Sequence, residues 1–339
     1  MNKVFSILGF LVFLLTAATA AQAITIDMVT VANPGNAPDS VVMNDGTSGY
    51  GEVDYTYKIG KFEITAGQYT AFLNAVARQA DPYLLGRVTG PGGTLQMNCN
   101  ITRSGTPGNY TYSVPADWAN RPVNYVDWGS AARFCNWMAN GQPNTGVEDL
   151  TTTEDGSYYI NGALINEALS TVTRKPTATW VIPSENEWYK AAYYDPNKNG
   201  TGSPGYWLYP TRSDDLPGNI LSSPDPGNSA NFVQGGAYTV GGPYWRTPVG
   251  AFTNSASTYG TFDQGGDVDE WNETSRRGGS FTQVSFALLS SEREYPLFRG
   301  MADATYGFRV AYVPEPSVFL LVVSAASVFV VFRARRLAE

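Results

Sequence analysis

The chain has 339 residues, 43% of them hydrophobic, which is enough to bury a sizeable core. Its formal net charge of −8 repels phosphate backbones, so we expect no binding to nucleic acid. It contains no histidine, which excludes Ser-His-Asp and Cys-His catalysis and every imidazole metal site.

The first 23 residues have the pattern of a signal peptide. Lys3 precedes an apolar run from Val4 to Leu15, and Ala21-Gln22-Ala23 is the small-x-small pattern at which signal peptidase cuts. We expect cleavage after Ala23 and export through the inner membrane, with an uncleaved anchor as the alternative. Residues 24–49 are expected to lead into a folded domain at residues 50–312.

Three helices are predicted from their start signals. Two begin with a capping box, in which two side chains satisfy free backbone N–H groups, and one begins with an aspartate. The predicted starts are Thr65-Ala66-Gly67-Gln68, Asp127 and Ser184-Glu185-Asn186-Glu187. Gly141 is placed to end the second helix. Residues 55–64 and 307–312 are predicted to be strands, and the 35 Gly and 21 Pro favour many loops.

Cys99 and Cys135 are the two cysteines of the chain. Outside the cytoplasm they can oxidise, so they are candidates for one disulfide. Such a bond would add about 3 to 4 kcal/mol in the chain-entropy model. The alternative is two unpaired thiols, because Cys135 falls within an apolar helical pattern.

The C-terminal end has three parts in a fixed order. Val313-Pro314-Glu315-Pro316 leads into an uncharged apolar stretch at 317–332, which is followed by Arg333-Ala334-Arg335-Arg336. As a helix the stretch spans about 24 Å, somewhat less than a bilayer core, with the arginines on the cytoplasmic side. This order resembles the PEP-CTERM sorting signal. The resemblance implies transient anchoring in the inner membrane, cleavage by an exosortase near Pro314-Glu315-Pro316 and transfer to the cell envelope, surface or extracellular matrix; a plain anchor is the alternative.

Several blocks between residues 50 and 312 share a second resemblance. They are Tyr57-Lys58-Ile59-Gly60-Lys61-Phe62-Glu63-Ile64-Thr65, Arg121-Pro122-Val123-Asn124-Tyr125-Val126-Asp127-Trp128, Ile182-Pro183-Ser184-Glu185-Asn186-Glu187-Trp188, Gly265-Gly266-Asp267-Val268-Asp269-Glu270-Trp271, Arg277-Gly278-Gly279-Ser280-Phe281 and Gly307-Phe308-Arg309-Val310. In this order they resemble the formylglycine-generating, or sulfatase-modifying factor, family. The resemblance implies an α+β fold related to C-type lectins, with three main helices, short strands and many loops.

The resemblance also shows what the chain lacks. The family's catalytic centre has two copper-binding cysteines shortly after the Arg277-Gly278-Gly279-Ser280 block, where this sequence has Gln283 and Leu288. Neither residue offers the thiolate that Cu(I) prefers, and iron-dependent relatives use histidines, so no copper or iron is expected. Paired carboxylates at Asp269-Glu270 or Asp214-Asp215 are the candidate acid and base of a hydrolase.

Structural calcium is the metal that the resemblance implies, in the segment 263–270. The expected ligands are two side-chain carboxylates and two backbone carbonyls, from Asp263, Glu270, Gly266 and Val268. Hard oxygens of this kind suit Ca²⁺, and an acidic surface turn is the alternative. A second calcium site would begin at Asn231 and Phe232, but Gly241-Gly242-Pro243 replaces the aspartate expected before Thr247-Pro248.

Two classes of function follow. The first is an exported, surface-targeted, noncatalytic binding or structural module that contacts extracellular polysaccharide or envelope proteins. Aromatic residues in loops can stack on sugars, although such rings more often pack in a core. These residues are Trp118, Trp207, Tyr209, Tyr244 and Trp245. The alternative is an enzyme, either a formylglycine-generating oxidoreductase with an altered centre or a carbohydrate-acting envelope enzyme.

Overall fold

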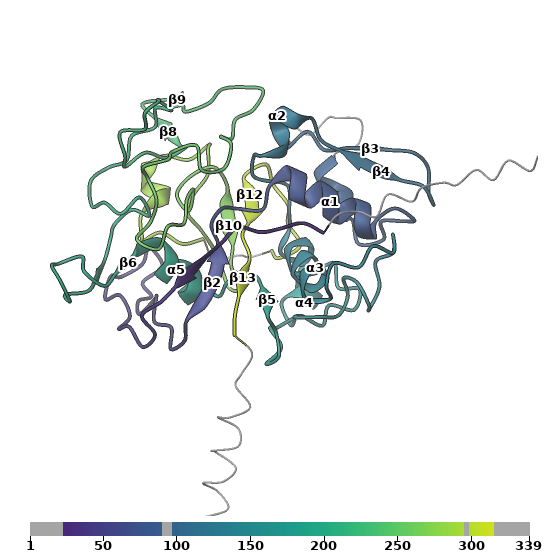
Figure 1. The fold of residues 1–339 in the computed structure, drawn as a ribbon, viewed down its shortest axis with the longest axis horizontal. Helices are drawn as coiled ribbons and strands as arrows, with labels where there is room; N and C mark the ends of the chain where they lie inside the picture. Colours follow the sequence, from purple (N-terminus) through teal and green to yellow (C-terminus); the bar gives the residue numbers. More distant parts are fainter. Residues whose placement is uncertain (1–22, 90–96, 295–297, 315–339) are drawn as a thin grey trace, which may run out of the picture.

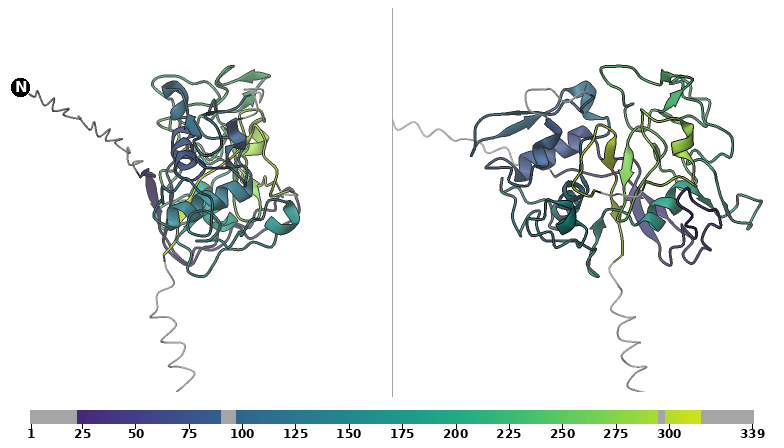
Figure 2. Two further views of the ribbon diagram at one scale, coloured as in Figure 1. Left: turned by 90° about the vertical axis from the view of Figure 1, so that its right-hand side faces the viewer. Right: turned by 180° about the vertical axis from the view of Figure 1, so that it is seen from behind.

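The computed structural model describes residues 23–89, 97–294 and 298–314. Short helices and strands are joined by long loops, and β10 and β12 lie between two halves of the molecule (Figures 1 and 2). Helices α1 and α3 lie on one side of these strands and α5 lies on the other. The predicted α+β fold with three main helices, short strands and many loops is confirmed.

The three main helices begin where their capping signals predict. They are α1 (Ala66–Val76), α3 (Trp128–Ala139) and α5 (Glu185–Tyr193). Thr65 and Gln68 exchange hydrogen bonds of 3.2 and 2.9 Å at the first helix, and Ser184 and Glu187 do the same at the third. The Asp127 carboxylate accepts from the Ser130 N–H at 2.6 Å. These caps are local, so they are visible in the sequence.

A four-stranded antiparallel sheet has the order β1-β2-β13-β5. Its strands are β1 (Met28–Val31), β2 (Tyr57–Gly60), β13 (Ala311–Tyr312) and β5 (Trp180–Val181). Ile59 of β2 lies opposite Val29 on one side and Ala311 on the other. The segment 24–49, which we expected to lead into the domain, therefore supplies an edge strand of its sheet.

A smaller sheet positions the candidate site. Strand β10 (Asp269–Trp271) pairs with β11 (Arg276–Arg277) in antiparallel and with β12 (Tyr306–Phe308) in parallel orientation. The predicted strand 307–312 is thus two strands, β12 and β13, which belong to different sheets. Arg309 stands between them with its side chain fully buried.

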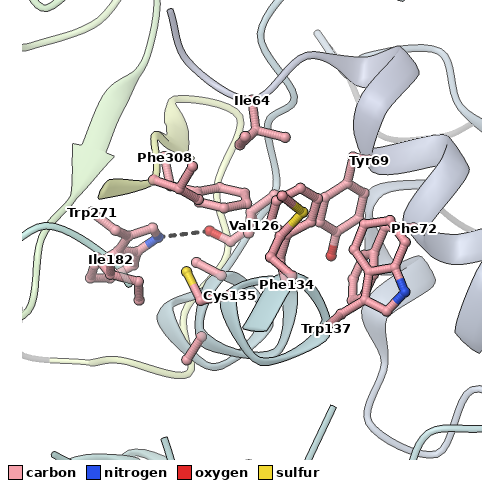
Figure 3. Close-up of a cluster of buried hydrophobic side chains, with 14 of the residues drawn as sticks. Ile64, Tyr69, Phe72, Val126, Phe134, Cys135, Trp137, Ile182, Trp271 and Phe308 are labelled. Atoms are coloured by element: carbon pink, nitrogen blue, oxygen red, sulfur yellow. Dashed lines mark hydrogen bonds between the residues drawn. The ribbon is translucent and has the colours of Figure 1, made fainter. Parts of the chain in front are cut away.

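The core between α1 and α3 is aromatic. Figure 3 shows rings from both helices packed against β12, with Phe72 5.2 Å from both Phe134 and Trp137 between ring centroids. The indole of Trp271 donates to the Val126 carbonyl at 2.8 Å, which satisfies its buried N–H. This packing joins β10 to the helical half.

The remaining elements are short. They are β3 (Thr102–Ser104), β4 (Thr111–Ser113), α2 (Ala116–Ala119), α4 (Asn166–Leu169), β6 (Tyr194–Asp195), β7 (Gly205–Tyr206), β8 (Val233–Gln234), β9 (Ala237–Tyr238) and the 3-10 helices Leu85–Thr89 and Ser285–Leu288. The strands among them form two-stranded antiparallel pairs, β3 with β4, β6 with β7 and β8 with β9.

The two predicted targeting segments lie almost wholly outside the described residues. The described residues begin at Ala23 and end at Pro314, which is exposed and lies two residues after β13. Glu315, Pro316 and the predicted span at 317–332 lie beyond it. Within the described ranges, no helix combines the length and the hydropathy needed to cross a bilayer.

Candidate functional site

The segment predicted to bind calcium forms a tight turn that runs into β10. Its backbone has φ of +60° at Asp263, +87° at Gly266 and +53° at Asp267. A Cβ at Gly266 would stand 2.1 Å from the Asn231 carbonyl oxygen, so the close approach requires glycine. The Asp267 N–H donates to the same oxygen at 3.0 Å. The turn therefore packs closely against the backbone of Asn231.

Glu270 is not a free ligand of this turn. Its carboxylate accepts from Nε and Nη2 of Arg309 at 2.5 Å each, and from the Trp188 indole at 2.7 Å. All three side chains are fully buried. Both oxygens of Glu270 thus take part in this ion pair, and its role as a calcium ligand stays a prediction.

A different carboxylate, Glu63, lies beside the turn. It is 2% exposed, and among the described residues neither of its oxygens accepts a hydrogen bond. Burial, followed by the charge of Asp263, raises its pKa well above the ordinary value. Burial and the charge of Asp267 also raise the pKa of Asp263 to about 7. Arg309 stands 3.9 Å from Glu63 and is already paired. The turn thus gathers several buried carboxyl groups near Arg309, while Arg246 acts on Asp267.

These groups are the candidates for holding a divalent cation. Within the described ranges, no group of three or more Asp, Glu or Cys side chains is placed to hold a metal. A calcium ion would therefore combine the carboxylates of Glu63 and Asp263 with backbone carbonyls, such as those of Gly266 and Val268. Glu63 is not among the predicted ligands because it lies far from the turn along the chain. Its place in the block before α1 was the available signal.

The second predicted calcium site is built differently. The Asn231 amide donates to the Trp245 carbonyl at 3.0 Å and to Asp267 at 2.7 Å. The Phe232 carbonyl accepts from Asn219 at 3.1 Å and from Thr239 at 3.3 Å. The Asn231 side-chain oxygen, in contrast, is buried and accepts no hydrogen bond among the described residues, so the second site stays a prediction.

A pocket of about 120 Å³ lies where the family resemblance places its catalytic cysteines. Gln283 lines it, and its amide donates to Glu294 at 3.0 Å and accepts from Ser280 at 3.1 Å. Leu288 is fully buried in the hydrophobic cluster around Phe232. Both positions therefore have structural contacts of their own and offer no sulfur.

Asp269 is the buried acid of this pocket. Burial and then the charge of Glu294 raise its pKa to about 8, so it is mostly protonated at neutral pH. The Arg276 guanidinium pairs with Glu294 and lies 3.6 Å from the ring centroid of Tyr306. Among the described residues, the Arg276 Nε has no hydrogen-bond partner.

The predicted carboxylate pairs do not converge. Successive residues of β10 point to opposite faces, so Asp269 lines the pocket while Glu270 meets Arg309. Asp214 binds the Lys198 ammonium at 2.8 Å, and Asp215 follows it on the exposed surface. Neither pair therefore forms a shared acid and base.

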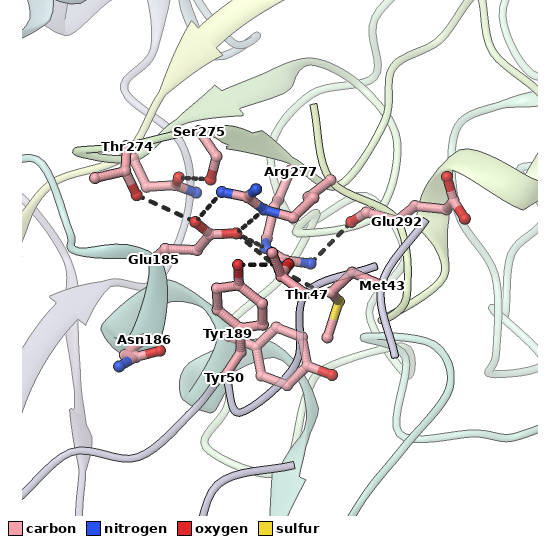
Figure 4. Close-up of polar contacts among 12 residues, drawn as sticks. Met43, Thr47, Tyr50, Glu185, Asn186, Tyr189, Thr274, Ser275, Arg277 and Glu292 are labelled. Carbon is pink, nitrogen blue, oxygen red and sulfur yellow. Dashed lines mark hydrogen bonds and ion pairs between the residues drawn. The ribbon is translucent and has the colours of Figure 1, made fainter. Parts of the chain in front are cut away.

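A buried ion cluster fixes one wall of the pocket (Figure 4). Glu185 of α5 accepts from Arg277 at 2.8 Å and from Arg293 at 2.7 and 2.8 Å. The Arg277 guanidinium also contacts the rings of Tyr50 and Tyr189, at 4.9 and 4.8 Å from their centroids. These contacts tie the N-terminal segment, α5 and β11 together.

Cys99 and Cys135 are both buried and unbonded, so the predicted disulfide is not formed. Cys135 points into the core from the middle of α3, as Figure 3 shows. Burial raises the pKa of Cys99 and raises that of Cys135 well above the ordinary value. Neither lines the pocket at Gln283. They are core thiols, the alternative that the apolar pattern around Cys135 indicated.

The structure separates the loop aromatics into two groups. Trp118 contacts Tyr244 with 5.0 Å between ring centroids, and both Trp118 and Trp245 line one pocket. Trp207 and Tyr209 lie outside this pocket. The Trp207 indole donates to Asp195 at 3.1 Å, and Tyr209 is buried in the cluster with Leu288.

Comparison with solved structures finds similar chains at 16% sequence identity. They include CarF, with 86% of this chain and 99% of that chain covered and a TM-score of 0.44. For Treponema denticola variable protein 1, 87% of this chain and 98% of that chain are covered, with a TM-score of 0.48. For PvdO from Pseudomonas aeruginosa, 85% of this chain and 94% of that chain are covered, with a TM-score of 0.43.

Sequence comparison gives the family. No curated protein sequence matches significantly. The family model described as the sulfatase-modifying factor enzyme 1-like domain matches residues 27–313, which include β1 and end just after β13. The chain therefore belongs to the family of sulfatase-modifying factor enzyme 1-like domains.

Proposed function

We propose that this protein is an exported, noncatalytic binding module with the sulfatase-modifying factor fold. The observation that carries the proposal is the chemistry at Gln283 and Leu288. One is an amide held by two hydrogen bonds, and the other is a buried leucine. Copper in this family is held by thiolates, and burial keeps the chain's own two thiols protonated and away from the pocket.

The proposed location is the cell envelope or surface. Signal peptidase would remove residues 1–23, the helix at 317–332 would anchor the chain transiently in the inner membrane, and an exosortase would cut near Pro314-Glu315-Pro316. The exposed position of Pro314, two residues after the last strand, supports access of a protease to this point. Extracellular polysaccharide or envelope proteins are the proposed partners.

Structural calcium is the proposed metal, and no copper or iron is proposed. Glu63 and Asp263 would supply carboxylates, with carbonyls from Gly266 and Val268. Among the described residues the oxygens of Glu63 accept no hydrogen bond, and Arg309 is 3.9 Å away; this supports the set, because a buried carboxylate that is poorly compensated is costly. Calcium would neutralise the cluster and fix the turn that leads into β10.

Copper-dependent oxygen consumption tests the proposal. The full chain in mild detergent is supplied with copper, a reductant and a cysteine-containing sulfatase peptide. We expect no oxygen consumption above that of the peptide and copper alone. Peptide oxidation that depends on the protein would overturn the noncatalytic assignment.

A carbohydrate-acting enzyme is the second candidate, and one observation favours it. Asp269 is an acid that stays protonated at neutral pH beside Glu294, as a general acid requires. Release of reducing sugar from matrix polysaccharide, abolished in Asp269→Asn, would establish this activity. If the folded protein releases no reducing sugar, the binding role is the one that remains.

A further inference from the structure

A second pocket, of about 470 Å³, opens between α2 and the loop that follows β9. Figure 1 shows α2 and the β8–β9 pair at the same end of the molecule. The lining residues are Met97, Asn98, Asn100, Trp118, Pro243 and Trp245. None of them carries a charge, whereas the pocket at Gln283 is lined by several acidic and basic side chains.

The floor of this pocket is fixed by a buried arginine. Arg246 is fully buried, and its guanidinium donates to the carbonyls of Met97 at 2.8 Å and Asn98 at 3.0 Å. Asn124 donates to the Met97 carbonyl as well, at 2.8 Å. The floor carbonyls are therefore occupied, and the backbone beneath the pocket is held before any ligand arrives.

The two indoles in the walls are also held. Trp118 packs on Tyr244, whose hydroxyl donates to Asp117 at 2.7 Å and whose ring stacks on the Arg121 guanidinium at 4.0 Å. Trp245 meets the ring of Tyr238 edge to face, at 5.0 Å between centroids. Its φ is +60°, which is uncommon for a bulky residue and is found more often at binding sites.

Polar groups in the pocket remain available. Among the described residues, no hydrogen bond engages the Asn100 side-chain amide or the indole N–H groups of Trp118 and Trp245. The Asn98 side-chain oxygen accepts from the Asn100 backbone N–H at 3.0 Å, which orients its amide. The pocket thus presents apolar ring surface together with uncharged donors and acceptors.

We propose that this pocket binds an uncharged sugar unit of a neutral polysaccharide. A pyranose ring has an apolar C–H face that packs on an indole, and hydroxyl groups that pair with amides and indole N–H groups. The absence of charge among the lining residues favours a neutral ligand over a uronate or an amino sugar. The inference rests on the proposed binding function and assigns its site and ligand class.

Affinity electrophoresis tests the site. The full chain in mild nonionic detergent is run through native gels that contain dextran, galactomannan or xyloglucan, with alginate as the anionic comparison. We expect at least one neutral polysaccharide to retard the protein. Trp245→Ala should weaken that binding about tenfold, and Asn100→Ala should weaken it severalfold.

Trp207→Ala is the matched control, because it removes a tryptophan outside the pocket and should leave retardation unchanged. Asn100→Ala removes no ring from the wall, so it tests the site even if Trp245→Ala unfolds. Three results would overturn the proposal: no retardation by any of the three neutral polymers, retardation by alginate alone, or equal binding by the wild type and Asn100→Ala. The oxygen assay is independent, so failure here leaves the noncatalytic assignment standing.

Discussion

Glu148 is 6% exposed and its carboxyl group interacts with that of Asp81, so replacing it by glutamine probes how burial controls stability. Burial and then the Asp81 charge raise the pKa of Glu148 from 4.5 to about 9. The folded protein therefore keeps the proton, while the unfolded chain releases it above pH 4.5. The contribution to stability is full below that pH and is lost as the pH rises toward 9.

The size of the effect follows from the shift. Each pKa unit is worth about 1.4 kcal/mol, so the loss between pH 4.5 and pH 7 is about 3 kcal/mol, and it approaches about 6 kcal/mol near pH 9. Glutamine resembles the protonated acid and does not titrate. Glu148→Gln should therefore leave stability near pH 4.5 almost unchanged and raise it by about 3 kcal/mol at pH 7.

Urea unfolding at a series of pH values between 4.5 and 8.5 measures this difference. Glu52→Gln is the control, because Glu52 is exposed and its substitution should give no pH-dependent gain. The reasoning is refuted if the free-energy difference between wild type and Glu148→Gln is the same at both ends of the series.

Three further predictions concern the turn and its neighbours. Glu270→Gln should lower the free energy of unfolding by about 3 to 5 kcal/mol, because it leaves Arg309 buried without its carboxylate; unfolding in urea checks this. Gly266→Ala should cost at least about 2 kcal/mol, whereas Gly235→Ala, with open space around it, should cost much less; equal losses would contradict the geometry. Calcium should raise the melting temperature of the wild type but not that of Glu63→Gln, and an equal shift in both would exclude Glu63 as a ligand.

Local signals in the sequence predicted the helices well. Thr65, Asp127 and Ser184 each cap the helix that the sequence assigned to them, because a cap depends on residues three positions apart. The family blocks likewise predicted the fold and the turn at 263–270, because each block is a run of neighbouring residues. Such a run can be recognised without knowing which distant residues it contacts.

Contacts between distant segments could not be predicted in this way. The ion pair between Glu270 and Arg309 joins residues far apart in the sequence, so the segment 263–270 alone does not reveal it. Glu63, from the residues before α1, lies beside the turn. The two thiols are buried and unbonded, so the predicted disulfide is not formed. Charge pairing and burial decide these sites, and both depend on the folded chain.

The most direct test of the central claim is the metal content of the purified protein. The full chain in mild detergent is exposed to calcium and copper under reducing conditions, freed of unbound ions and examined by inductively coupled plasma mass spectrometry. The account predicts calcium without copper in the wild type and reduced calcium in Glu63→Gln. Stoichiometric copper in the wild type would contradict it and restore the oxidase.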